Sequence, residues 1–566
     1  MSDSGSRTRS ISRPRLAFAA VAIAVSAAVS LAGCGGIPTS GDVTAGDVIS
    51  DDVELDVGFA PQGPRVGATQ EEIMQDFILA ATNPQGDYAV ARDFLAQDFA
   101  EAWEPDALTT IRTGVGTQRR DSDTVLNYSL TSAASVSADG HYSEGDSENV
   151  NLQFSFVKEG DEWRISDAPD GIVLSQDSFG VVFGEYPIYF FDPTYQFLVP
   201  DVRWFPNRSR SALRVVAAML SGPSSWLSGG VLTSAFPAGT QLGEGLVEVT
   251  AGVATVDLSE EARGASALER ERMRQQLSAS LVGVSSVVIT VGGIALPIAD
   301  TGQPVAVTTP VVEPAPLVLR GDEFGFASND DVTSLGPIST KVVELGATAV
   351  TLARGKSEAA VLAGGVVYVV RGGAAAPLAV DSRPGLAAPS IDNAGYVWSV
   401  PAANASAVRV FALDGTSHDV SSTLAPDARV VSMVVSRDGA RVLFYLSTSS
   451  GPQLTVYGIV RQDGVPVGLG EPFSLPVGTE TPVGATWVDN RTVATLSAAD
   501  DETVIRSYGI GGPSVVLGQL ELATTIVGGN AGSDGLRVLS NEQVFRPRGT
   551  SWQQTGTSAQ LLATQQ

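Results

Sequence analysis

Apolar residues recur at helical spacing where the chain first shows a regular pattern. Ile73, Phe77 and Ala81 stand four positions apart, which predicts one buried face of a helix. Thr69 and Glu72 come just before this stretch, three positions apart, which is the spacing of a capping box. The pattern therefore predicts a helix that begins directly after Thr69.

A two-residue period follows a second predicted helix over residues 89–99. The segments VLNYSLTSAASV and VNLQFSFVKEGDEWRIS alternate apolar and polar side chains, with Trp163 and Ile165 on one face and a turn at 158–161. Helices followed by a curved antiparallel sheet predict an α+β domain over residues 66–181, which resembles an NTF2-like cone. Since no convergent polar set is visible for a pocket, we expect a spacer or interaction domain.

Helices and strands alternate over residues 182–304. The helix in RSALRVVAAMLSGP ends at Gly222, VEVTAGVATVDLSEE reads as a hairpin, and a helix with Arg270, Arg272 and Arg274 on a predicted solvated face precedes the strand VVITV. The order LSGP, LTSAFPAGTQL, GVATVDLS and VVITVGG resembles the GerMN domain. The resemblance implies an α/β fold and no established catalytic residue.

A repeat follows the proline-rich linker 305–316. Asp392, Asp438, Asp489 and Asp534 each occupy a turn between two short strands, 46, 51 and 45 residues apart. A weaker copy is LARGKSEAAVLAGGVVYVV. A period of about 40–50 residues with several strands per unit is typical of a β-propeller. We therefore predict an all-β propeller of five or six blades over residues 317–566, with aspartates that shape turns rather than bind metal.

The amino-terminal stretch carries an export pattern. Four arginines precede an uncharged run that ends in Leu31-Ala32-Gly33-Cys34, so residues 1–33 are predicted to be a signal peptide; a retained membrane anchor is the alternative. The last four residues resemble the lipobox of bacterial lipoproteins, which implies acyl chains (diacylglycerol, with palmitate as the expected acid) on Cys34 and cleavage before it. Residues 34–65 would form a flexible tether.

Composition narrows the chemistry. A net charge of −27 argues against binding nucleic acid. With one cysteine and only His141 and His418, no Cys/His dyad, metal cluster or cofactor site can be assembled, so we predict no catalytic residue, no metal and no cofactor. A pair of carboxylates that hydrolyses wall glycans stays open, because Asp and Glu are plentiful.

The module order resembles one family. A lipobox, an α+β domain, a GerMN domain and a propeller together resemble the LpqB family of actinobacterial lipoproteins. The resemblance implies a non-enzymatic protein, lipid-anchored on the outer face of the cell membrane. It would bind the extracytoplasmic part of the sensor kinase MtrB and modulate the MtrA–MtrB system, which affects cell envelope and division. A module that binds cell-wall glycan or peptide is the alternative, and a carboxylate-based wall hydrolase is a third.

Overall fold

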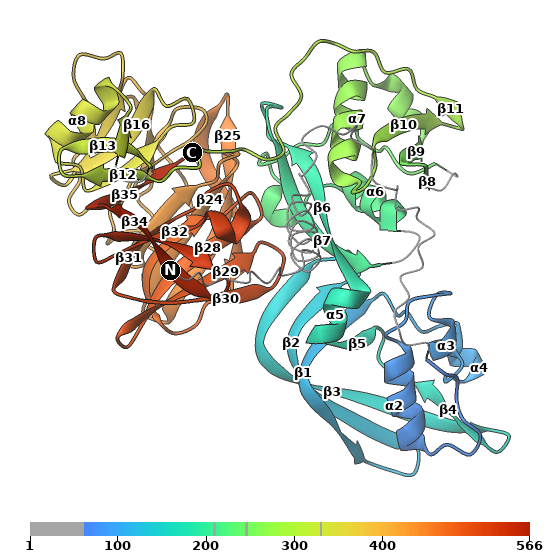
Figure 1. Cartoon of the computed structure of the whole chain (residues 1–566). Helices are drawn as coiled ribbons and strands as arrows, with labels where there is room; N and C mark the ends of the chain where they lie inside the picture. The colour runs from blue at the N-terminus through green and yellow to red at the C-terminus, as the bar shows by residue number, and fades with distance from the viewer. Residues whose placement is uncertain (1–60, 208–210, 244–246, 329–330) are drawn as a thin grey trace, which may run out of the picture. The chain divides into compact units, whose positions relative to one another are not determined.

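The computed structural model describes residues 61–207, 211–243, 247–328 and 331–566 (Figure 1). The predicted signal peptide, the lipidation site Cys34 and nearly all of the tether lie outside these residues. Within them, no helix is both long and apolar enough to cross a bilayer. The predicted first helix is α2 (Gln70–Ala80), and Thr69 and Glu72 form the predicted capping box at its start.

A five-stranded sheet forms the first domain together with α2. Its order is β4 (Glu162–Asp167), β3 (Tyr142–Glu159), β2 (Val125–Ser137), β1 (Leu108–Arg120) and β5 (Ile172–Ser175), and Figure 1 shows β1, β2 and β3 as long, curved neighbours. All pairs are antiparallel except β1 with β5, so the sheet is mixed rather than wholly antiparallel as predicted. A short helix, α5 (Gln176–Val182), follows.

Aromatic side chains fill the interior of this domain. The ring centroids of Phe77 and Trp103 lie 5.1 Å apart, those of Phe77 and Phe154 lie 6.1 Å apart, and all three residues are buried. Rings at these separations pack favourably. The sheet and helix therefore enclose a packed core.

The predicted helix over residues 89–99 is wrong. Two four-residue helices, α3 (Ala89–Arg92) and α4 (Gln97–Ala100), stand in its place. Between them the chain pairs with β4, because the Ala96 N–H donates to the Ile165 carbonyl at 2.7 Å and the Ile165 N–H donates to the Phe94 carbonyl at 3.0 Å. Pairing with the sheet thus interrupts the predicted helix, and only its two ends are helical.

The middle region combines a ribbon with an α/β unit. The ribbon is β6 (Phe183–Phe191) paired with β7 (Leu198–Pro206), followed by α6 (Ser211–Ser221) and η1 (Ser225–Leu227). The sheet has the order β11 (Ile294–Ala295), β10 (Ser286–Val291), β9 (Val253–Leu258) and β8 (Glu248–Thr250). Strands β9 and β10 run parallel, joined through η2 (Glu260–Gly264) and α7 (Ala267–Ser280), which confirms the α/β class.

The predicted solvated face of α7 is only partly solvated. Arg274 is exposed, but Glu271 is buried and accepts a hydrogen bond from the Thr301 N–H at 3.2 Å. The guanidinium of Arg272 lies 3.5 Å from the centroid of the Tyr195 ring. The interpretation is therefore wrong for Arg272 and for the neighbouring Glu271, which is covered as well, because the chain after the GerMN sheet and the β6–β7 ribbon both cover this helix.

The carboxy-terminal region is a propeller with six four-stranded blades. Sheets β19–β22, β23–β26, β27–β30 and β31–β34 are one blade each, and an eight-stranded sheet contains two more. In that sheet the last strand of the chain, β35, pairs antiparallel with β12 and parallel with β15, so the final strand closes the ring. A helix, α8 (Pro337–Leu345), joins the two blades of that sheet.

The strand bounds follow the chain: β12 (Leu317–Arg320), β13 (Glu323–Ser328), β14 (Asp331–Ser334), β15 (Ala349–Leu352), β16 (Glu358–Ala363), β17 (Val366–Arg371), β18 (Leu378–Asp381), β19 (Ser390–Ile391), β20 (Val397–Ser399), β21 (Arg409–Phe411), β22 (Ser417–Asp419), β23 (Arg429–Val435), β24 (Arg441–Thr448), β25 (Gly451–Gln462), β26 (Val465–Leu475), β27 (Thr481–Trp487), β28 (Thr492–Ala499), β29 (Glu502–Gly509), β30 (Ser514–Glu521), β31 (Ala523–Val527), β32 (Arg537–Ser540), β33 (Gln543–Arg548), β34 (Ser551–Ser558) and β35 (Leu561–Gln565).

Candidate interaction site

The repeated aspartates occupy turns. Asp392, Asp438, Asp489 and Asp534 all lie between the first and second strands of successive blades. Asp392 accepts hydrogen bonds from the backbone N–H of Tyr396 at 2.9 Å and from Trp398 Nε1 at 3.1 Å, and it is buried. These bonds fix a turn in the way expected of Asp. No group of three or more His, Cys, Asp or Glu side chains in the described part of the chain is arranged to hold a metal ion.

Three residues that are far apart in sequence meet in an Asp–His–Ser array. Asp139 and His141, in the turn between β2 and β3, are joined by an Oδ2–Nδ1 contact of 2.8 Å. The other ring nitrogen of His141 lies 2.8 Å from Ser224 Oγ, which precedes η1 in the middle region. Sequence reasoning missed this array, because no pattern links residues 141 and 224.

The hydrogen-bond directions distinguish this array from a catalytic triad. Ser224 Oγ donates its proton to Asp201 Oδ1 at 2.6 Å and accepts from Arg203 Nη2 at 3.2 Å. Because the serine proton is already used, His141 Nε2 must donate to Ser224 rather than act as its base. Ser224 is also buried. The array thus joins the first domain to the middle region instead of presenting a nucleophile.

The second histidine joins no such array. His418 lies in β22, and its ring centroid is 6.3 Å from that of Tyr396. Edge-to-face contact of this kind is a packing interaction. Neither histidine therefore has the partners of a general base.

The linker is bound across the turns at one end of the propeller. We call residues 307–313 the linker strap. Asn490 Nδ2 donates to the Thr308 carbonyl at 2.7 Å, and Asn530 brackets Val312, accepting from its N–H at 2.7 Å and donating to its carbonyl at 2.5 Å. Gln565 brackets Glu313 in the same way, at 3.0 and 3.2 Å. Side-chain amides thus replace the neighbouring strand that an extended segment would otherwise pair with.

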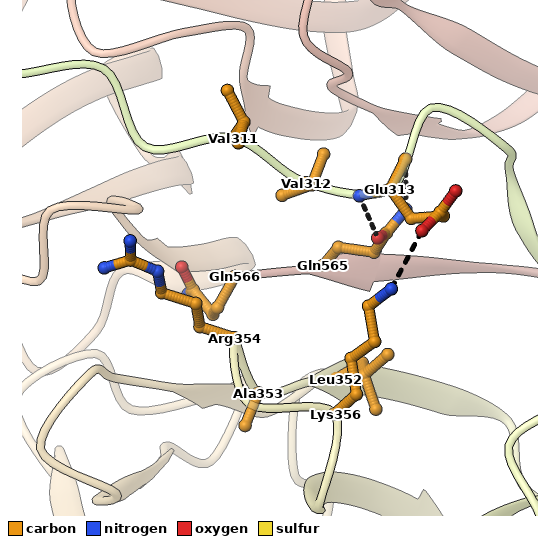
Figure 2. Close-up of a pocket in the computed structure, with 9 residues that line it drawn as sticks. All are labelled: Val311, Val312, Glu313, Leu352, Ala353, Arg354, Lys356, Gln565 and Gln566. Atoms are coloured by element: carbon orange, nitrogen blue, oxygen red, sulfur yellow. Dashed lines mark hydrogen bonds and ion pairs between the residues drawn. The ribbon is translucent and has the colours of Figure 1, made fainter.

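A cavity of about 240 Å³ opens between the strap and the propeller (Figure 2). We call its surroundings the propeller mouth: the turn 353–357, the turns that carry Asn490 and Asn530, and Gln565 with Gln566. Lys356 Nζ lies 2.8 Å from Glu313 Oε2, and Figure 2 shows Lys356 reaching toward Glu313 while the Arg354 guanidinium points away from that pair. Within the described chain, Arg354 has no carboxylate partner; it lies 5.1 Å from the centroid of the Phe197 ring.

The centre of the mouth is closed. Arg437 Nη1 donates to the Gly529 carbonyl at 2.8 Å, and Gln566 Nε2 donates to the Val435 carbonyl at 2.9 Å. Burial lowers the pKa of Arg437 to about 10, although the nearby Asp489 acts in the opposite direction. The remaining void of about 10 Å³ has room for one water. A ligand would therefore meet the rim of the mouth rather than an open channel.

Comparison with known families covers most of the chain. Residues 63–180 match the family described as "Lipoprotein LpqB, N-terminal domain", residues 327–560 match "Lipoprotein LpqB beta-propeller domain", and residues 187–296 match "Sporulation and spore germination". These are not enzyme families.

Curated relatives carry one name. Lipoprotein LpqB of Cutibacterium acnes is 32% identical over 50% of this chain and 48% of its own length, so the chain spans about half of that relative. Lipoprotein LpqB of Rhodococcus opacus is 23% identical over 95% of this chain and 94% of its own length. The protein of the same name from Streptomyces coelicolor is 27% identical over 78% of this chain and 79% of its length.

Solved structures resemble single regions. The first GerMN domain of GerM from Bacillus subtilis is 18% identical, with a TM-score of 0.18, and covers 22% of this chain and 97% of that domain. TolB from Acinetobacter baumannii is 12% identical, with a TM-score of 0.32, and covers 43% of this chain and 64% of its own. Because two LpqB family descriptions flank the GerMN match and relatives across actinobacteria share the name, this chain belongs to the LpqB family of lipoproteins.

Proposed function

We propose that this chain is an accessory protein, lipid-anchored on the outer face of the cell membrane, that binds the extracytoplasmic part of the sensor kinase MtrB and modulates the MtrA–MtrB system. The observation that carries the proposal is the family match on both sides of the GerMN region. The lipobox ending at Cys34 supports the anchor, since several acyl chains on one residue make a stable attachment.

The chemistry of the described residues favours binding over catalysis. Ser224 and His141 are oriented against nucleophilic attack. The carboxylates of Asp392, Asp438 and Asp489 accept hydrogen bonds from backbone N–H groups. A protein that works by binding gains from confinement to the membrane, because tethering raises the effective concentration of two partners.

Glycan binding through aromatic platforms is less well supported. Sugars stack on exposed Trp or Tyr rings, whereas each of the seven tryptophans and eleven tyrosines of the chain is buried or partly buried in the described structure. This favours a protein partner over a wall glycan.

The test is a deletion strain with complementation, in which kinase-dependent promoter output and recovery of MtrB by membrane crosslinking are both measured. We expect altered output in the deletion strain and recovered kinase with the wild-type chain. A Cys34→Ser chain should restore output poorly at native expression and better when overproduced. Unchanged promoter output in the deletion strain, together with no recovery of MtrB, would contradict the proposal.

A further inference from the structure

The linker strap is held largely through its backbone, since Pro310 alone among residues 307–313 is buried. Val311 is 64% exposed, whereas Val312 and Glu313 are each bracketed by one side-chain amide. Hydrogen bonds of this kind bind the backbone of an extended segment and accept most side chains, as in the addition of a strand to a sheet edge. The one side-chain contact with specificity is the ion pair between Glu313 and Lys356.

The turn that receives Glu313 differs from the equivalent turns of the four blades formed by β19–β34. Each of those turns carries an Asp, with one arginine beside it in two of them (Arg437 and Arg491), whereas this turn has no Asp and carries two cations, Arg354 and Lys356. Lys356 is paired with the strap, but Arg354 is exposed and has no carboxylate partner in the described chain, although it lines the same cavity. The strap therefore uses one of two cations.

The spacing of the strap indicates what the second cation could bind. Side chains two residues apart on an extended segment point to the same face. Val311, two positions before Glu313, also lines the cavity, and Figure 2 shows it on the Arg354 side of the view. A carboxylate at the position of Val311 would give Arg354 the partner that the strap does not supply.

We propose that the propeller mouth binds an extended acidic peptide of a partner protein, with two carboxylates two residues apart, and that the linker strap occupies this site in the partner's absence. The proposal deepens the binding role proposed above by assigning a surface and a partner chemistry to it. The strap is anchored at both ends, because Val307 pairs with Phe197 and Leu317 lies in β12, so residues 308–313 can leave the mouth while both anchors stay in place. A tethered occupant has an effective concentration of about millimolar, so a partner must bind better than the strap to replace it.

The experiment measures binding of labelled synthetic peptides to the purified, lipidated full chain in detergent, by fluorescence anisotropy. One peptide has the sequence of residues 309–317, TPVVEPAPL, and a second has Glu at the position of Val311, TPEVEPAPL. An exposed ion pair changes an equilibrium constant by up to about fivefold, so we expect the second peptide to bind about fivefold more tightly.

Variants of the chain separate the contacts. Arg354→Gln should abolish the advantage of TPEVEPAPL and leave TPVVEPAPL unchanged, whereas Lys356→Gln should weaken both peptides. Glu313→Lys should repel the strap from Lys356 and increase the affinity for both peptides at least about fivefold. Arg429→Gln removes an exposed cation at the start of β23 and serves as the matched control, with no expected change.

Three results would overturn the inference. The first is that neither peptide binds saturably to the Glu313→Lys chain at millimolar concentration. The second is that both peptides bind the wild-type chain with equal affinity. The third is that free acetate displaces a labelled peptide as well as an unlabelled peptide does. A charge swap, Glu313→Lys with Lys356→Glu, should restore strap binding and shows whether Glu313→Lys acts through this pair rather than through misfolding. If no peptide binds but MtrB is still recovered from membranes, this inference fails and the proposed function stands. If a peptide binds but MtrB is not recovered, the peptide site stands and the proposed function fails.

Discussion

Hydrogen-bond direction decides what the Asp–His–Ser array does. In His141 both ring nitrogens face oxygen atoms, the carboxylate of Asp139 and the hydroxyl of Ser224, whose own proton points to Asp201. The ring thereby bridges the turn that carries Asp139 and the segment that carries Ser224. Arg203 completes the junction with a 2.7 Å contact to Asp201. The same three residue types that hydrolyse esters elsewhere therefore act here as a joint between segments.

Replacing His141 should loosen that joint. His141→Ala removes two hydrogen bonds in a partly exposed site, and we expect a loss of about 1–2 kcal/mol in the free energy of unfolding. Denaturant unfolding followed by tryptophan fluorescence measures the loss. The matched control is His418→Ala, which removes only an aromatic contact in β22 and should cost less. Equal losses for both variants would contradict the assignment.

Asp381 makes the stability of the fold depend on pH. Burial alone would raise its pKa, but hydrogen bonds from Arg383 and Ser399 outweigh burial and hold the pKa below its ordinary value. A lowered carboxylate pKa stabilises the fold above the ordinary value of about 4, and the stabilisation is lost as pH falls toward the lower value in the folded state. Asp381→Asn should therefore cost about 2 kcal/mol at pH 7 and progressively less toward pH 3. Unfolding midpoints of both chains across this range measure the difference, and a gap that stays constant would contradict it.

At the scale of elements, the sequence predicts correctly those features that depend on contacts between residues close together in the chain. The capping box at Thr69, the turn at 251–252 and the end of α6 before Gly222 are confirmed, because each rests on residues within a few positions of one another. The helix over 89–99 failed because Ile165, some 70 positions later, pairs with that segment. Strand β1 was not predicted, since its glycines and arginines interrupt the alternation of apolar residues.

The candidate site shows the same division. The absence of Asp from the turn that carries Arg354 and Lys356 is visible in the sequence once the repeat is aligned. The contact of Lys356 with Glu313, 43 positions away, is not visible, and neither is the bracket of Glu313 by Gln565, which spans 252 positions. Blade number was equally hidden, since one blade takes its inner strand, β35, from the end of the chain and its other strands from residues 317–334.

Closure by β35 makes a prediction about this element. Deleting residues 561–566 removes the partner of both β12 and β15, so their backbone amides should become the least protected in the propeller. Hydrogen exchange measures this, and the intact blade β23–β26 is the internal control with the smallest expected change. Unchanged protection of β12 and β15 would mean that β35 does not hold the ring closed.

At the scale of the whole molecule, the domains share packed surfaces. One continuous hydrophobic cluster includes residues of the GerMN region and of the propeller, and the ring centroids of Trp226 and Phe473 lie 5.1 Å apart across it. Trp204 of β7 packs on Phe179 of the first domain, with centroids 4.9 Å apart, and its Nε1 donates to the Gly511 carbonyl of the propeller at 2.7 Å. A single side chain thus contacts elements from three regions.

Trp204 should therefore control whether the regions unfold together. Trp204→Ala removes a large buried ring and its hydrogen bond, and we expect a loss of about 3–5 kcal/mol, with the first domain unfolding separately from the propeller. Differential scanning calorimetry follows the transitions, and Trp204→Phe distinguishes the two contributions, because it keeps most of the packing and loses only the bond to Gly511. Trp552→Phe is the matched control: its Nε1 donates to the Leu517 carbonyl at 3.0 Å within the propeller, so its loss should lower stability without separating the transitions. If Trp204→Ala leaves the number of transitions as it is in the wild-type chain, the other contacts between the regions, such as the His141–Ser224 junction, are sufficient and Trp204 is a local core residue.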